Sequence, residues 1–144
     1  MPLAAKQLSL TSRFSPIEDH HERLAAIVSH GQRWPEVSST EQVPAHQIHA
    51  CLSPVWLTGA FVDSTCHFRL SATSPLVKGL ASLLVELYHG ESPEDILAFE
   101  PSLLSQLHLL HHISPTRLHG LDHIRQTIRN FAKTIITTTH DRRP

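Results

Sequence analysis

One stretch of the chain carries the pattern of paired strands, and helical patterns lie on both sides of it. Residues 55–62, VWLTGAFV, are rich in β-branched and aromatic side chains. Residues 65–70 then alternate polar side chains with Cys, Phe and Leu, which is the period of a half-buried strand. Asp63 and Ser64 between the two segments favour a hairpin turn. A hairpin among helices predicts an α+β fold with a small antiparallel sheet.

A third strand is predicted just before the hairpin. Ile48, Ala50 and Leu52 alternate with polar residues and with Cys51, so a short strand is expected to lead up to the cysteine. The sheet is therefore expected to have three strands, packed with helices.

Helix starts recur around this sheet as a serine followed by a proline. Serine is a favoured N-cap, and proline fits the first helical position. Leucines at helical spacing follow several of these pairs, and Gly31 and Gly90 are suited to end helices. The predicted starts are Ser15, Ser74, Ser92 and Ser114, and a short further helix is expected around residues 103–110.

The length of 144 residues is typical of one domain. Within it, residues 1–13 are expected to be a flexible N-terminus. Residues 14–135 are then the domain, and 136–144 a frayed tail.

Charge and hydropathy exclude several classes of protein. Twelve basic against 13 acidic residues remove the electrostatic case for nucleic-acid binding. No apolar run approaches the roughly 20 residues of a membrane span, and the start lacks the apolar region of a secretory signal. Two cysteines do not make a disulfide-rich scaffold. These features favour reduced thiols and a cytoplasmic location.

Cys51 is the residue whose surroundings most suggest chemistry. Free cysteine is among the most buried residue types, so an inert core thiol is one interpretation. A boundary between strand and loop is also a common place for a reactive group. An attacking thiol must ionise, and a nearby cation lowers its pKa. His46 and His49 are local candidates, whereas Lys78 and Arg117 would reach Cys51 through the fold.

Metal binding is a second interpretation of the same residues. Cysteine and histidine side chains at positions 46, 49, 51, 66 and 67 have the atoms that zinc or an iron–sulfur cluster requires. There is no CxxC pair, and strand alternation accounts for Cys66 as a core residue. We therefore assign no metal ligands. A Cys-His hydrolase would need an orienting Asn or Asp and an oxyanion hole, which the spacing does not identify.

Four blocks of the chain, in order and spacing, resemble the SufE family. These proteins are sulfur acceptors for cysteine desulfurases in iron–sulfur cluster assembly, and the resemblance runs from about residue 14 to 133. The blocks are HGQRWPEV (30–37), IHACLSPVWL (48–57), LVKGLASLLVELYHGESPEDILAF (76–99) and HISPTRLHGLDHIRQTIRNFA (112–132).

The resemblance implies both a fold and a role for Cys51. The fold would be shared with cluster scaffolds of the IscU type. Cys51 falls on the acceptor cysteine, which takes persulfide sulfur from a SufS-like desulfurase or a paralogue, stimulates that enzyme and passes sulfur to an iron–sulfur scaffold. The protein would then be a sulfur-transfer accessory rather than a stand-alone enzyme. It would bind no cofactor, because pyridoxal phosphate belongs to the desulfurase, and would be a monomer or homodimer.

Other positions match the family blocks with less defined roles. Arg117 matches the basic residue of the SPTR block and either supports the loop and the developing thiolate or forms a surface ion pair. Gln32 and Arg33 match the GQR block, with a structural or partner-contact role. Residues 55–57 would cover the acceptor thiol. The positions assigned to the loop or partner contact are Gln32, Arg33, His49, Trp56 and Lys78.

The chain also departs from the family pattern near the cysteine. Ala50 stands where the family usually has glycine, Leu52 replaces a polar residue, and Pro54 stiffens the loop. Residues 71–73, Ser-Ala-Thr, replace an acidic segment. These departures suggest a divergent paralogue with a different desulfurase or weaker activity. A regulatory partner that carries no sulfur, or a metal-binding scaffold built on Cys51, remains an alternative.

Overall fold

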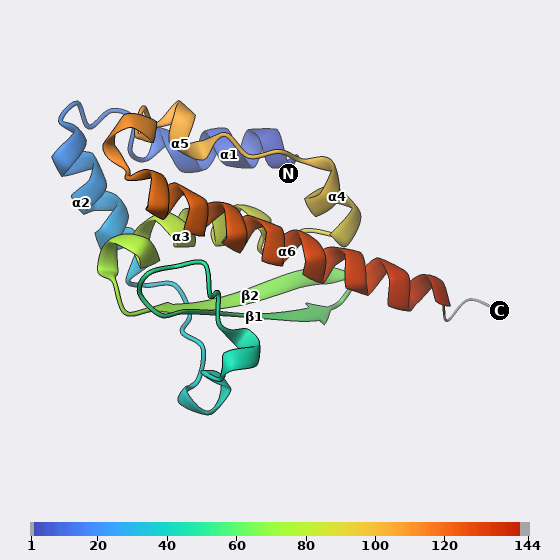
Figure 1. Cartoon of the computed structure of the whole chain (residues 1–144). Coiled ribbons are helices and arrows are strands. Elements are labelled where there is room, and N and C mark those ends of the chain that lie inside the picture. Colours follow the sequence, from blue (N-terminus) through green and yellow to red (C-terminus); the bar gives the residue numbers. More distant parts are fainter. Residues whose placement is uncertain (1, 142–144) are drawn as a thin grey trace.

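The computed structural model describes residues 2–141 and confirms the α+β class (Figure 1). The strands are β1 (Val55–Val62) and β2 (Thr65–Ala72), and three single 3-10 turns are η1 (Ser39–Glu41), η2 (Pro44–His46) and η3 (Leu110–His112). The helices are α1 (Leu3–Ser12), α2 (His20–Gly31), α3 (Pro75–Tyr88), α4 (Pro93–Ala98), α5 (Leu103–Gln106) and α6 (Pro115–Asp141).

The predicted hairpin is confirmed, with β1 and β2 antiparallel along their whole length. Asp63 and Ser64 form the turn at φ 51° and 66°, and positive values at both positions match the right-handed twist of the flanking strands. The predicted third strand is wrong: the sheet described within residues 2–141 has two strands. Gln47 makes one isolated bridge to Trp56, after which the chain turns away, so no ladder continues toward Cys51.

Three of the predicted serine caps are confirmed. The hydroxyl of Ser74 accepts the N–H of Val77, and the hydroxyl of Ser92 accepts the N–H of Asp95. At the start of α6, the Arg117 N–H donates to the Ser114 hydroxyl.

The predicted start of a helix at Ser15 is wrong. Helix α2 begins at His20, and Asp19 caps it by accepting the N–H groups of His21 and Glu22. A carboxylate satisfies two free N–H groups there and also lies at the positive end of the helix. These N–H bonds lower the pKa of Asp19.

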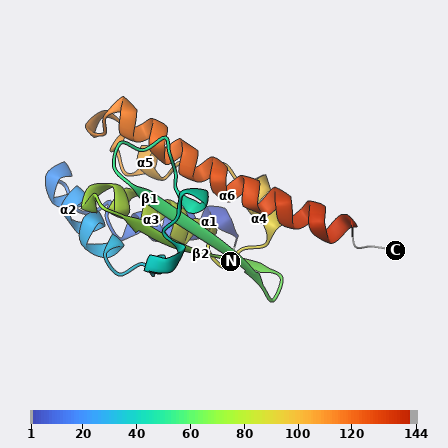
Figure 2. The ribbon, with the colours of Figure 1, turned by 60° about the horizontal axis from the view of Figure 1, so that its bottom comes forward.

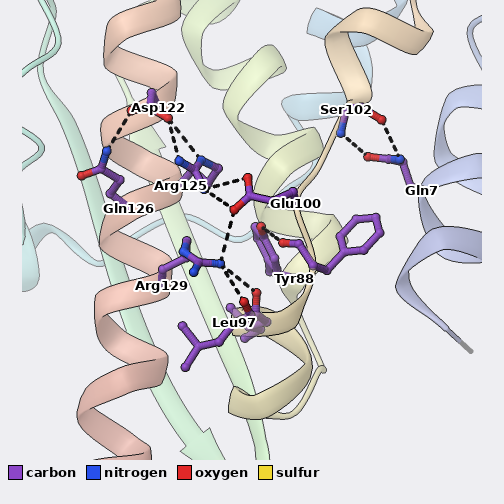
Figure 3. Close-up of polar contacts among 11 residues, drawn as sticks. Gln7, Tyr88, Leu97, Glu100, Ser102, Asp122, Arg125, Gln126 and Arg129 are labelled. Carbon is purple, nitrogen blue, oxygen red and sulfur yellow. Dashed lines mark hydrogen bonds and ion pairs between the residues drawn. The ribbon is translucent and has the colours of Figure 1, made fainter.

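Within the described residues, two segments near the chain ends are helical where the sequence predicts a flexible or frayed segment. Where a flexible segment 1–13 is expected, α1 buries Leu3 and Leu10, and its Gln7 side chain exchanges two hydrogen bonds with Ser102 (Figure 3). At the other end, α6 continues to Asp141, beyond the domain boundary predicted at residue 135. The rest of the predicted tail, residues 142–144, lies outside the described residues.

Helix α3 is the centre of the core. It contacts α1, α2, α6 and β2, and Figure 1 shows it between the sheet and the layer of α1 and α5. Figure 2 shows α6 running along the molecule beside β1. The connection from α4 to α6 is held by ion pairs from Arg125 and Arg129 to Glu100, and Tyr88 donates to the carbonyl of Phe99 (Figure 3).

No helix within residues 2–141 is long and apolar enough to cross a membrane.

Candidate functional site

Cys51 lies in the loop between η2 and β1, and backbone contacts shape this loop at both ends. The N–H of Ile48 donates to the carbonyl of Val55 at 2.8 Å, and the N–H of Thr73 donates to the carbonyl of Pro54 at 3.2 Å. The Cys51 side chain is half-buried, whereas the neighbouring Leu52 side chain is 87% exposed. The loop therefore turns its thiol toward the protein and an apolar side chain toward solvent.

The sulfur of Cys51 packs against the backbone of α6. A Cβ atom added at Gly120 would lie 2.8 Å from the Cys51 sulfur, closer than real contacts allow. Only glycine permits the loop and the helix to approach this closely. Gly120 was not predicted as a site residue, although a glycine within an amphipathic helix pattern is itself a signal of close packing.

A pocket of about 380 Å³ opens beside the thiol. Residues at the starts of α3 and α6 line one side of it, including Ser74, Ser114, Thr116 and Arg117. Among the described residues, no carboxylate lines this pocket. The first turns of two helices and Arg117 therefore line the pocket beside the cysteine, and their positive electrostatic potential favours an anion such as a thiolate or a perthiolate.

The free thiol is nevertheless held in its neutral form. Burial raises the pKa of Cys51, because removal from water disfavours the thiolate. The two predicted imidazole partners are engaged elsewhere: a ring nitrogen of His46 bonds the Glu41 carbonyl, and one of His49 bonds the Pro44 carbonyl. Cys51 is therefore a protonated thiol at neutral pH in this conformation.

Lys78 does not reach the cysteine. Its side chain is buried, where it forms an ion pair with Glu36 and donates to the carbonyl of Trp34 at 3.2 Å. Burial lowers the pKa of Lys78. The hydroxyl of Ser71 donates to the same carboxylate, so Lys78 fixes the segment after α2 against β2. A structural role replaces the predicted role near the loop.

The remaining predicted positions are spread over the surface around the hairpin. Gln32 and Arg33 are exposed at the end of α2, and Trp56 is half-buried on β1. Arg117 is exposed at the rim of the pocket. The apolar lining beside Cys51 comes from Leu52 and from residues of α3 and α6, not from the predicted cover at residues 55–57.

The second cysteine is separated from this site. Cys66 pairs with Phe61 in the distal half of the hairpin, about 20 Å along the strand from the end near Cys51. It is fully buried, and burial raises its pKa to about 11. Both thiols are free. Within residues 2–141 no three His, Cys, Asp or Glu side chains are grouped to hold a metal ion.

Comparisons with known proteins give a matching family and a solved structure of similar fold. The family model described as "SufE: Fe-S metabolism associated domain" matches residues 8–132. The solution structure of a hypothetical protein from Thermus thermophilus superposes with a TM-score of 0.72 at 21% identity. The match covers 94% of this chain and 96% of that chain, and it shows a shared fold.

Proposed function

The chain belongs to the SufE family, whose domain is associated with iron–sulfur metabolism, and from this premise we propose that Cys51 accepts sulfur from a cysteine desulfurase. The protein then stimulates the desulfurase and passes the sulfur to iron–sulfur cluster assembly. The main support is the position of Cys51, which lines an open pocket rich in hydrogen-bond donors, whereas Cys66 is enclosed in the core.

The transfer is an exchange between thiols. The Cys51 thiolate attacks the outer sulfur of a persulfide on the desulfurase, and a new S–S bond forms at Cys51 as the donor S–S bond breaks. The sulfur of the desulfurase cysteine leaves as a thiolate and takes up the proton that the Cys51 thiol lost. The products are a Cys51 persulfide and the free desulfurase thiol, so no external oxidant or reductant is needed.

Docking must activate the thiol, because the free protein keeps it protonated and packed on Gly120. In this proposal the desulfurase binds the exposed Leu52 and draws the loop outward. Ala50 and Pro54 limit the backbone freedom available for that motion. A desulfurase that fits this stiffer loop is therefore the expected partner.

Arg117 and the two helix starts support the charged states of the reaction. A perthiolate on Cys51 would carry its negative charge into a pocket whose described lining contains a guanidinium and no carboxylate. In this proposal Arg117 stabilises that anion after transfer. It is a positioning residue for the product rather than the acceptor itself.

The remaining parts of the proposal concern the surroundings of the protein. Pyridoxal phosphate belongs to the desulfurase, and the final sulfur acceptor is an iron–sulfur scaffold. A cytoplasmic location fits this chemistry, because thiols stay reduced there.

Mass spectrometry without reductant tests the proposal. The protein is incubated with cysteine and a panel of desulfurases, and wild type is compared with Cys51→Ser and Cys66→Ser. The expected result is one added sulfur atom on the Cys51 peptide of wild type and Cys66→Ser, and none in Cys51→Ser.

Two outcomes count against this function. No added sulfur from any competent desulfurase would reject the acceptor role. Full stimulation of a desulfurase by Cys51→Ser would show instead a regulatory partner that carries no sulfur.

A further inference from the structure

The two outer edges of the hairpin differ. On β2 the outward-facing backbone groups from Cys66 to the N–H of Leu70 are paired. In the antiparallel register, every second residue of β2 directs its N–H and C=O away from β1. Loops and side chains cover these groups. The contacts are Cys66 N–H to Glu91 O (2.8 Å), Gly90 N–H to Cys66 O (2.7 Å), Phe68 N–H to His89 Nδ1 (3.0 Å), Trp34 Nε1–H to Phe68 O (3.2 Å) and Leu70 N–H to Pro35 O (3.0 Å).

The distal half of β1 has no such cover from the described residues. Gly59 and Phe61 pair with Phe68 and Cys66, so their N–H and C=O groups also point away from the hairpin. Within residues 2–141 these groups have no hydrogen-bond partner. Residues 58–62 contain no charge and no proline, the usual devices that block an open edge. This edge is therefore free to pair with another strand.

We propose that this edge pairs with the same edge of a second copy of the chain, antiparallel about a two-fold axis at Ala60. Gly59 would then face Phe61 of the second copy, and the two residues would exchange backbone hydrogen bonds. By symmetry, Phe61 of the first copy would exchange the same backbone hydrogen bonds with Gly59 of the second copy. The two hairpins join into one continuous four-stranded sheet.

The side chains on the core-facing side of β1 fit this register. Phe61 is 41% exposed, and Gly59, opposite it in the dimer, has no side chain. A pocket of about 300 Å³ lies beside Gly59, and Phe131 of α6 forms part of its wall. The ring of Phe61 from the second copy would enter this pocket and meet Phe131. An exposed aromatic ring thus lies two residues along the strand from a hollow whose apolar lining is Leu57, Phe68 and Phe131 and whose polar lining includes Glu41 and His46.

The opposite side of the strand is also self-complementary. Ala60 would face Ala60 of the second copy, and Val62, which is 51% exposed, would face Thr58. No like charges meet at any of these pairs. The bridge from Gln47 to Trp56 occupies the proximal part of the edge, so pairing is confined to residues 58–62. A short interface predicts a weak dimer that depends on concentration.

Sedimentation velocity over about a hundredfold range of protein concentration tests this dimer. The variants are Ala60→Glu and Ala60→Lys, each of which places two like charges at the two-fold axis. Either variant alone is expected to raise the dimer dissociation constant about tenfold or more. A one-to-one mixture of the two is expected to restore association, because opposite charges then face each other. Ala25→Glu makes the same change at an exposed alanine on α2 and is expected to behave as wild type.

Wild type that stays monomeric at every concentration would overturn the proposal. So would a dimer that Ala60→Glu and Ala60→Lys leave unchanged. Ala60 is exposed in the monomer, so both variants are expected to fold, and circular dichroism checks this. Sulfur loading of Cys51 is expected to be the same in all variants, because the dimer edge lies in the half of the hairpin away from the Cys51 loop.

Discussion

The environment of Cys51 favours its protonated form, while the proposed sulfur transfer requires the thiolate. Burial raises the thiol pKa, and the pocket beside it gathers helix N-termini and Arg117, which favour an anion. A small movement of the loop would therefore take the Cys51 sulfur out of the buried contact that disfavours the thiolate and bring it toward groups that stabilise the thiolate. The sequence pattern identified this cysteine, but its contact with Gly120 follows from the packing of two segments far apart in the chain.

Alkylation kinetics test the protonation state of the two thiols. The rate of iodoacetamide reaction with Cys51 is expected to rise up to and beyond pH 9, because burial raises the pKa above its ordinary value of 9.0. Cys66 is expected to react only after unfolding, since it is enclosed in the core. Peptide mapping assigns each label, and a midpoint near pH 7 for Cys51 would contradict the raised pKa.

The variant Gly120→Ala tests the packing of the loop on α6. The added methyl group would overlap the Cys51 sulfur, so the thiol is expected to move outward and react several times faster with iodoacetamide. Stability is expected to change by less than about 1 kcal/mol, because the gain in helix propensity offsets the lost contact. Urea unfolding measures this, and an unchanged alkylation rate would show that the contact does not restrain the thiol.

Among the secondary-structure elements, close packing decides where α2 crosses α3. A Cβ atom at Gly79 would lie 2.8 Å from the Val28 backbone, and one at Gly31 would lie 2.6 Å from the Gly79 backbone. The sequence predicted both helices, but nothing in either helix alone indicates that these two glycines meet. The helix backbones that these glycines touch cannot move aside, whereas the Cys51 loop that touches Gly120 can.

The variant Gly79→Ala is therefore expected to be destabilised, in contrast to Gly120→Ala. Overpacking against a helix backbone costs about 1–3 kcal/mol, which exceeds the helix-propensity gain. Urea unfolding of the two variants under one set of conditions provides the comparison. Equal stability of Gly79→Ala and Gly120→Ala would contradict the expectation that a methyl group against a helix backbone costs more than one against the movable Cys51 loop.

His89 connects the end of α3 to β2 and makes this contact depend on pH. Its Nδ1 accepts the N–H of Phe68, so the ring must be neutral there. Burial, His67 and Lys6 lower its pKa, while Glu86 acts in the opposite direction. The folded protein thus binds this proton less readily than the unfolded chain does. The stabilisation is complete above the unfolded pKa of about 6.5. It decreases below that pH and is lost once the pH has passed the lower pKa of His89 in the folded protein.

Urea unfolding at pH 7.5 and 5.5 measures this dependence. Wild type is expected to lose more stability on acidification than His89→Asn, which lacks the titrating ring. His49→Asn removes an exposed histidine of the loop and is expected to keep the wild-type dependence. An identical pH dependence in wild type and His89→Asn would exclude His89 as the source.

For the molecule as a whole, the N-terminal helix belongs to the folded unit. Leu3 and Leu10 of α1 are buried, and Gln7 satisfies both the N–H and the hydroxyl of Ser102. The short pattern of α1 predicts little by itself, because isolated helices of this length are marginal in water. Contacts with α3 and α5 supply the missing stability.

Two leucines on α1 distinguish a docked helix from a flexible tail. Leu10→Ala is expected to cost about 2–4 kcal/mol because its side chain is 4% exposed. Leu8→Ala is expected to change stability by less than about 0.5 kcal/mol because its side chain is 65% exposed. Urea unfolding of both measures the difference, and an equally small effect at the two positions would place α1 outside the cooperative unit.

The sequence by itself determined the features that depend on near neighbours. Alternation and turn residues identified the hairpin, and the serine caps located the starts of α3, α4 and α6. The cysteine-containing block made Cys51 the candidate acceptor, and that block could be read locally because its residues are contiguous. Asp19, and not the predicted Ser15, caps helix α2, so the local pattern was wrong about which residue starts this helix.

The tertiary structure alone decided the features that join distant segments. It ended the strand expected before Cys51, paired Lys78 with Glu36 and placed Gly120 against the thiol. Each of these depends on which backbone or charge arrives from elsewhere in the chain. The local sequence pattern sets the conformational preference of each single element. Which side chains are buried, which charges pair and which backbones approach closely is decided only when the elements pack together.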